Sequence, residues 1–207
     1  MTPEYFKQHA NELKHVFERT YVNRDLREHE VLQDIERGFV HYRTLSDNVR
    51  SIFIYAFSEM MNNAIDHSQG DTIKIIVQVV EGRVSFSVDD NGIGVFRNVQ
   101  QRFGLKNPFE AMQEILKGKT TTMPQMHSGE GIFFTSKVAD GFHLNSYGYK
   151  LRVVTEPESD IFMERAHGYK QGTRVTFNLK LDSKKHLNDI FKQYTNVRDD
   201  GAHGFDK

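Results

Sequence analysis

The 207-residue sequence has no cysteine, no large net charge, no long apolar run and no signal-peptide core. Without cysteine the chain can form neither a disulfide framework nor a thiolate metal site. Its 27 basic and 28 acidic residues nearly cancel, which argues against a general binder of polyanions. No apolar run approaches the roughly 20 residues that a membrane-spanning helix needs, and the charged N-terminus "MTPEYFKQHANELKH" lacks a signal-peptide core. We therefore expect a soluble, cytoplasmic protein that contacts neither a membrane nor nucleic acid directly.

Helical spacing of apolar residues organises the first third of the chain. A first helix is expected to begin at Thr2-Pro3-Glu4, and its apolar stripe is Phe6, Ala10, Leu13 and Phe17. A second, short helix is expected from Asp25, with Glu28 three positions later as in a capping box. A third and stronger helix should open at Thr44 and Asp47 and bury Val49, Ile52, Phe53, Ala56, Phe57, Met60, Met61 and Ala64.

The period of the apolar residues changes from helical to alternating after "HSQGD". A turn at Glu81-Gly82 separates two such alternating runs. The first consists of Ile73, Ile75, Val77 and Val79, and the second of Val84, Phe86 and Val88. This pattern predicts an antiparallel hairpin with one buried face, whose second strand leads directly into "DDNGIG".

The segment 95–128, next in the chain, is too long for an ordinary connection. Within it, Asn107-Pro108 with Glu110 predicts a helix start, and Gly118 predicts its end. Further strands are expected near residues 142–147, 151–155, 161–165 and 173–181, and a last amphipathic helix at Leu187, Ile190, Phe191 and Tyr194. This layout predicts an α+β fold, a two-layer α/β sandwich with a mixed, mainly antiparallel sheet and helices on one face.

Polar residues cluster in "FSEMMNNAIDHS", within the third expected helix. Glu59, Asn63 and Asp66 share one helix face, since they stand at positions i, i+4 and i+7. An amide and two carboxylates along one line can hold a hard cation and orient a water molecule. A solvated helix face is the commoner meaning of such a pattern, so this stretch alone does not decide.

The stretch "VDDNGIG" places Asp90 at the end of the expected buried-face strand. Gly92 and Gly94 allow a sharp turn and the close approach of a ligand. A fixed carboxylate at this point could accept a hydrogen bond from an exocyclic amine such as that of adenine. An Asn-Gly hairpin turn is the plainer interpretation, but no strand of matching period comes within a few residues.

Two more motifs are weak when taken singly. Gly129 and Gly131 in "HSGEGIFF" precede a helix, whose first amides can bind an anion. Thr173 in "GTRVTFNL" heads an inner strand, where its hydroxyl could reach a base or a bridging water, although an ordinary β-branched strand residue is the commoner meaning of this pattern.

The order and spacing of the four motifs resemble the GHKL (Bergerat-fold) ATP-binding family of gyrase B subunits, MutL, sensor histidine kinases and anti-sigma-factor serine kinases. The resemblance covers residues 45–182. It implies that Asn63 coordinates Mg²⁺ between the phosphates and that Glu59 polarises the attacking water or hydroxyl. It further implies nucleotide contacts by Asp90 at the adenine, Gly92 and Gly94 beside the base, Gly129 and Gly131 at the triphosphate, Thr173 near the adenine, His67 near the ribose and phosphates, and Asp66 as in the gyrase-like "NAID".

The resemblance has one departure, at Glu130, where most kinases carry Leu or Met between the two glycines. A carboxylate near a triphosphate is repelled unless it faces away or helps to hold the cation. The segment 95–128 would form a lid over the nucleotide, and its five basic residues outnumber two acidic ones. Lys119 in "GKTTT" is the expected phosphate contact there, although a solvated loop lysine explains it as well.

The resemblance suggests three parts: a helical extension at residues 1–43, an ATP-binding domain at 44–182, and a helix with a linker or tail at 183–207. A regulatory switch of the anti-sigma-kinase type fits best, with ATP and Mg²⁺ as cofactors and slow hydrolysis or serine/threonine phosphotransfer to a protein partner. The sequence looks particularly like bacterial regulators in which this ATPase precedes a STAS-like domain, which would act in cis or in trans. A homodimer is left open.

Three other interpretations stay open from the sequence. The main rival is a nucleotide-sensing module without catalysis. A histidine kinase is less well supported, because His29-Glu30 lacks the proline expected a few residues on. A gyrase- or MutL-like ATPase would require the chain to be a fragment.

Overall fold

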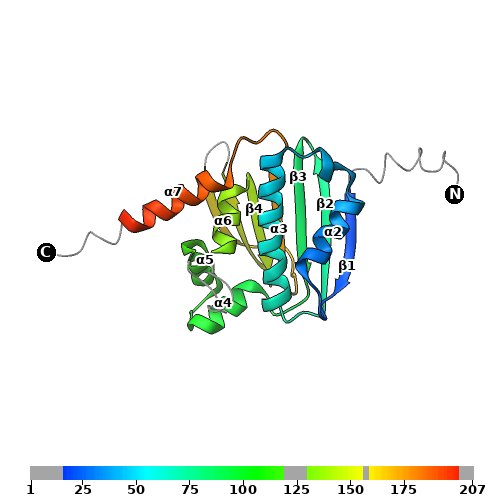
Figure 1. The fold of residues 1–207 in the computed structure, drawn as a ribbon. Coiled ribbons are helices and arrows are strands. Elements are labelled where there is room, and N and C mark those ends of the chain that lie inside the picture. Colours follow the sequence, from blue (N-terminus) through cyan, green and yellow to red (C-terminus); the bar gives the residue numbers. More distant parts are fainter. Residues whose placement is uncertain (1–15, 119–129, 156–158, 201–207) are drawn as a thin grey trace.

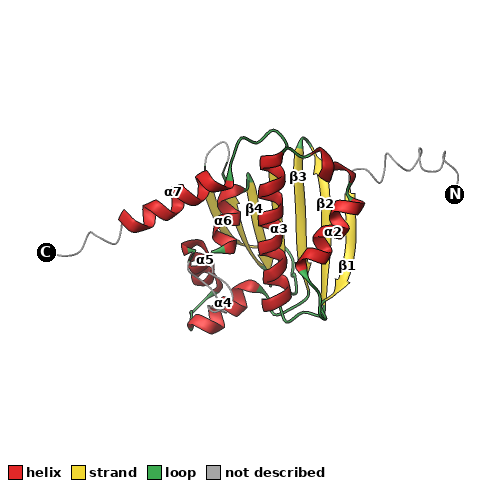
Figure 2. Ribbon diagram, in the orientation of Figure 1, coloured by secondary structure: helices red, strands yellow, loops and turns green. Residues whose placement is uncertain are grey.

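The computed structural model describes residues 16–118, 130–155 and 159–200, with side chains up to Tyr194 in the last helix. One seven-stranded sheet has the order β1-β2-β3-β7-β4-β5-β6, and helices cover one of its faces (Figures 1 and 2). The strands are β1 Val16–Val22, β2 Thr72–Val80, β3 Arg83–Asp90, β4 Gly141–Ser146, β5 Tyr149–Val154, β6 Asp160–Arg165 and β7 Arg174–Lys180. The helices are α2 Glu28–Gly38, the 3₁₀ helix η1 Val40–Thr44, α3 Asp47–His67, α4 Val95–Phe103, α5 Pro108–Lys117, α6 Gly131–Val138 and α7 Leu187–Asp200.

The two-layer α+β sandwich expected from the sequence is confirmed. Each pair of neighbouring strands is antiparallel, where we expected a mixed sheet dominated by antiparallel pairs. The core lies between α3 and the sheet, and its centre is aromatic: the Phe86 ring stacks on Phe177 at 4.9 Å and meets Phe53 and Phe57 edge-on. Aromatic pairs of this kind add to the free energy gained by burying the rings.

The long helix and the hairpin agree with their apolar patterns. All eight stripe residues expected on α3 are buried. On the hairpin, the residues that alternate toward the helices are buried as expected, except that Val79 is only partly covered. The period of a pattern therefore predicted which face of each element enters the core.

The expectation for Phe17 was wrong, because this residue lies on a strand instead of a helix. β1 pairs antiparallel with β2, from Val16 opposite Gln78 to Val22 opposite Thr72. Phe17 and Tyr21 are the partly buried residues of this strand, and a spacing of four satisfies both a helix and a strand. The rest of the expected first helix lies outside the described residues.

The second helix begins later than expected. Asp25 has a left-handed φ of 55°, and α2 starts at Glu28 after Arg27 as its N-cap. Val31 and Ile35 of α2 belong to the same core as the sheet. The expected domain boundary at residue 43 stays a prediction.

The long segment contains two helices, α4, which was not predicted, and α5, which agrees with its predicted ends. The Asn107 side chain caps α5 by accepting hydrogen bonds from the amides of Phe109 and Glu110, and Gly118 ends it in the left-handed conformation. α4 and α5 lie together below α6 in the view of Figure 1. They are the described part of the expected lid.

The last helix, α7, joins the body through aromatic rings. Phe191 contacts Tyr55 of α3 at 5.3 Å and Phe134 of α6 at 4.9 Å, while Tyr194 contacts Phe133 of α6 at 5.6 Å between ring centroids. The C-terminal part of α7 extends away from the sandwich (Figure 1). Within the described part of the chain, no helix is both long and apolar enough to cross a bilayer.

Candidate functional site

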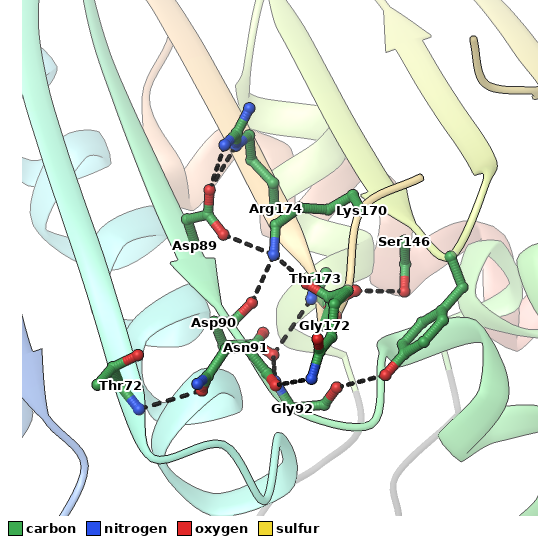
Figure 3. Close-up of polar contacts among 12 residues, drawn as sticks. Thr72, Asp89, Asp90, Asn91, Gly92, Ser146, Lys170, Gly172, Thr173 and Arg174 are labelled. Atoms are coloured by element: carbon green, nitrogen blue, oxygen red, sulfur yellow. Dashed lines mark hydrogen bonds and ion pairs between the residues drawn. The ribbon is translucent and has the colours of Figure 1, made fainter. Parts of the chain in front are cut away.

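The end of β3 carries a carboxyl group that backbone amides hold in place (Figure 3). Asp90 is 4% exposed, and its Oδ1 accepts hydrogen bonds from the amides of Gly92 at 2.8 Å and Thr173 at 3.1 Å. The Asp90 amide donates in turn to the Thr173 carbonyl at 2.9 Å. Oδ2 takes no hydrogen bond from the described residues, yet it is not fully enclosed. One oxygen thus orients the carboxyl group, and the other can accept a hydrogen bond from a ligand.

Burial raises the pKa of the Asp90 carboxyl above its ordinary value, because surroundings of low polarity disfavour the charged form. The hydrogen bonds from Gly92 and Thr173 and the charge of Lys170 lower the pKa, and the charge of Asp89 raises it further. The ionisation of the Asp90 carboxyl group, the acceptor of this site, therefore depends on Gly92, Thr173, Lys170 and Asp89.

Lys170 connects this acid to the one beside it (Figure 3). Its Nζ donates to the Asp90 carbonyl at 2.7 Å and lies 2.8 Å from Oδ1 of Asp89. Nε of Arg174 donates to Oδ2 of Asp89 at 2.6 Å. The positive charges of Lys170 and Arg174 thus neutralise the charge of Asp89. Of the two neighbouring acids, Asp90 is therefore the one whose Oδ2 can accept a hydrogen bond from a ligand.

Two glycines after β3 lie where no side chain fits. A Cβ on Gly92 would lie 1.9 Å from the carbonyl oxygen of Ser68, which accepts a hydrogen bond from the Ile93 amide at 2.8 Å. Ser68 is the residue that ends α3, so the turn is joined to that helix. Gly94 has a φ of 83°, and its Cβ would lie 2.5 Å from the ring of Tyr147. The backbone here is packed as closely as glycine allows.

Thr173 caps a helix, which the sequence did not predict. Its Oγ1 accepts a hydrogen bond from the amide of Val95, the first residue of α4, at 2.9 Å. The residue is 6% exposed and directly precedes β7. Its backbone and side chain therefore tie together β3, β7 and the start of α4.

The predicted polar helix face lies along α3. Glu59, Asn63 and His67 are half-buried, and Asp66 is exposed. A Cβ on Gly131 would lie 2.0 Å from Oε2 of Glu59. The Glu59 carboxylate thus lies against the first residue of α6, at the end of the helix where backbone amides favour negative charge. Asn63 makes no side-chain hydrogen bond with the described residues.

Glu130 directly precedes α6 and lies near the same helix face. Burial raises the pKa of the Tyr55 phenol well above its ordinary value, and the charges of Glu59 and Glu130 both add to this rise. Two carboxylates therefore act on one phenol of α3. Lys119 and Gly129, the other residues predicted at this end of the site, lie outside the described residues.

The structure brings the predicted residues together in two groups. One group lies at the strand ends around Asp90, and the other lies where α3 meets the start of α6. Sequence reasoning missed Tyr147, Lys170 and Gly172, which contact the first group. The signal for Lys170 and Gly172 was weak: "GYKQGT" shows a glycine-bounded turn before Thr173, but nothing in it says which strand end the turn covers. Tyr147 lies in a different stretch, "NSYGYK", where only the Tyr-Gly pair suggests a turn.

Comparison with known proteins identifies the fold that carries this site. No curated protein matches the chain. The family model of histidine kinase-, DNA gyrase B- and HSP90-like ATPases matches residues 48–183, well over half of the chain. This match spans α3, the strand-end network around Asp90 and the start of α6. The chain thus belongs to the family of histidine kinase-, DNA gyrase B- and HSP90-like ATPases, the GHKL type of ATP-binding module.

Proposed function

We propose that this chain is an ATP·Mg²⁺-binding signalling switch that slowly hydrolyses ATP or transfers its phosphate to a serine or threonine of a partner protein. The observation that carries the proposal is the Asp90 carboxyl, buried and held through one oxygen by two backbone amides. A carboxylate fixed in this way accepts one hydrogen bond in one direction, as the amino group of adenine requires. Gly92 and Gly94 keep the neighbouring backbone free of side chains.

The start of α6 and the face of α3 support a phosphate and metal site. Gly131 brings the first turn of α6 against Glu59 of α3, and Asn63 is one helical turn further along the same face. Among the described residues, no group of three His, Asp or Glu side chains is arranged to hold a metal. A site with few protein ligands, such as the face of α3 that carries Asn63, suits Mg²⁺. This ion typically takes one or two protein ligands and completes its coordination shell with water and phosphate oxygens.

Each residue has a separate task in the proposed reaction. Asn63 would hold the cation, and the cation would neutralise charge on the phosphates. Glu59 would accept a proton from the attacking water or hydroxyl, which positioned carboxylates do in general base catalysis. Asp66 and His67 would contact the nucleotide further along α3, with Lys119, Gly129 and Gly131 at the phosphates and Thr173 beside the base.

The alternatives differ in the step that comes after ATP binding. A nucleotide sensor without catalysis is favoured by one observation: the charges of both Glu59 and Glu130 act on the Tyr55 phenol, and two carboxylates in this region oppose an approaching polyanion. A histidine kinase would need its phospho-accepting helix on a dimerising hairpin. His29 lies instead on α2, which packs through Val31 and Ile35 onto the core of this domain. The proposal also includes a protein partner, for which a STAS-like domain is one candidate. It further includes the formation of a homodimer.

Calorimetric titration with ATP and GTP in the presence of Mg²⁺ tests the binding step. We expect ATP to bind and Asp90→Asn to weaken it by at least about 100-fold, roughly 2.7 kcal/mol, because the new amide would oppose the adenine amino group with another donor. Asn keeps the oxygen that accepts the two backbone amides, so the fold should persist. Asp160→Asn, the same change on the edge strand β6, is the matched control.

Transfer of label from γ-labelled ATP distinguishes the possible reactions. Label on a partner serine or threonine supports the kinase, and free phosphate alone supports an ATPase. Binding without either product would select the sensor. Equal affinity of the wild type and Asp90→Asn for ATP would contradict the whole assignment.

A further inference from the structure

The turn between β4 and β5 contains a residue that is unfavourable for its backbone. Ser146 pairs with Tyr149, so the connection is a two-residue hairpin turn of Tyr147 and Gly148. Their φ values are 48° and 80°, a combination for which Asn-Gly or Asp-Gly is the favoured sequence. A tyrosine is strained in the left-handed region, because its Cβ crowds the backbone. The contacts that compensate this strain lie outside the hairpin.

Tyr147 joins the two segments that flank Asp90. Its hydroxyl donates to the carbonyl of Gly92 at 2.8 Å, and its amide donates to the carbonyl of Lys170 at 2.7 Å. Gly92 is the residue whose amide holds Asp90 Oδ1, and Lys170 is the residue whose ammonium holds the Asp90 carbonyl. One side chain and its backbone therefore fix both neighbours of the buried acid.

The ring of Tyr147 is held as firmly as its hydroxyl. The guanidinium carbon of Arg97 lies 3.8 Å from the ring centroid, a close cation–π contact, and the Tyr169 ring meets it edge-on at 5.3 Å. Arg97 belongs to the first turn of α4, whose first amide is capped by Thr173. The close approach of the ring to Gly94 completes the contact with the turn after β3.

We infer that Tyr147 is a positioning residue for the nucleotide base. It holds the Asn91–Gly94 turn and the loop that carries Lys170 so that Oδ2 of Asp90 points at the base. The inference rests on the proposed function, since it concerns the same site. It predicts that losing the Tyr147 hydroxyl weakens adenine recognition without affecting the phosphate end.

Tyr147→Phe tests this, because it removes the hydroxyl and keeps the ring and the turn. Tyr169→Phe is the matched control: its ring lies 5.3 Å away, is 70% exposed, and has no hydroxyl hydrogen bond in the described part of the chain. We expect Tyr147→Phe to weaken ATP and ADP binding by the same factor, about fivefold to tenfold. Its melting temperature should stay within about 2 °C of the wild type, and the amides of Gly92 and Ile93 should exchange hydrogen faster. Tyr169→Phe should change none of these quantities.

The outcomes separate the two proposals. Equal ATP affinity of the wild type and Tyr147→Phe overturns the inference alone. A loss for ATP that greatly exceeds the loss for ADP also overturns it, because the effect would then lie at the phosphates. Failure of the wild type to bind either nucleotide overturns the proposed function and this inference with it.

Discussion

The two ends of the proposed nucleotide cleft are built by different means. At the adenine end, backbone amides, a lysine and a tyrosine hold Asp90, and close packing admits only glycine beside it. At the phosphate end, Glu59 and Asn63 are side chains on the face of α3, beside the first turn of α6. Under the proposed function, recognition of the base would depend on backbone and side chains fixed at the strand ends, whereas chemistry would depend on two side chains of one helix face.

The largest expected effect comes from Glu59→Gln. If Glu59 is the general base, turnover should fall by roughly 10²- to 10⁴-fold, while ATP affinity should not fall, because the substitution removes a like charge near the phosphates. A steady-state phosphate-release assay and calorimetry measure the two quantities separately. Glu18→Gln on β1, an exposed acid far from α3, is the control. A parallel loss of affinity would show that Glu59 contributes to binding and would remove the contrast between the two ends.

Gly172→Ala tests how tightly the adenine end is packed. Gly172 has a φ of 74°, and an added Cβ would lie 2.1 Å from the backbone oxygen of Asp90. Gly104→Ala is the matched control, because its φ is 63° and nothing lies within 4 Å of the added Cβ. We expect Gly104→Ala to cost about 1 kcal/mol of unfolding free energy and Gly172→Ala roughly 3 kcal/mol or more. Urea unfolding measures both, and equal costs would contradict the packing argument.

The raised pKa of Asp90 predicts opposite effects of pH on binding and on stability. Because Oδ1 accepts two amides, protonation would place a hydroxyl at Oδ2, where its hydrogen would oppose the adenine amino group. ATP affinity should therefore fall by up to about tenfold for each pH unit below this pKa. The folded-state pKa lies above the unfolded value, so this group favours the folded state most at low pH. That contribution is lost as pH rises through the folded-state pKa. Asp90→Asn should abolish the pH dependence of stability that comes from this group, as thermal melting of the nucleotide-free proteins would reveal.

The smallest expected effect is an increase in ATP affinity on the substitution Glu130→Gln. Removing one like charge near a polyanion is worth about 1 kcal/mol in a partly exposed site, or roughly fivefold in ATP affinity. Glu164→Gln on β6 is the control, and titrations with ATP and ADP should show a larger gain for ATP. An unchanged affinity would mean that Glu130 faces away from the phosphates, and a lower affinity would mean that it helps to hold the cation.

Periodic elements were predictable because burial repeats with the geometry of the element. The stripe of α3 and the alternation of β2 and β3 gave the faces that enter the core, and the glycines after Asp90 marked the end of a strand. Phe17 was misassigned because a spacing of four fits both helix and strand. The strand became evident only from its partner β2, which is about 50 residues away in the chain.

The contacts around Asp90 were less predictable, because they join segments that are distant in sequence. Lys170 and Tyr147 reach the strand end across 80 and 55 residues of chain. No local pattern predicts which turn of an antiparallel sheet covers another. Thr173 was predicted as a site residue from its place at the head of a strand. Its hydroxyl, however, caps α4, and this contact could be predicted only if the start of that helix were known.

The packing of α7 links its position to that of two other helices. Phe191 rests on both Tyr55 of α3 and Phe134 of α6, the helices that carry Glu59 and Gly131. A change in the spacing of those two helices must reseat that ring. The direction of the outward-pointing end of α7 (Figure 1) would therefore change with the distance between α3 and α6.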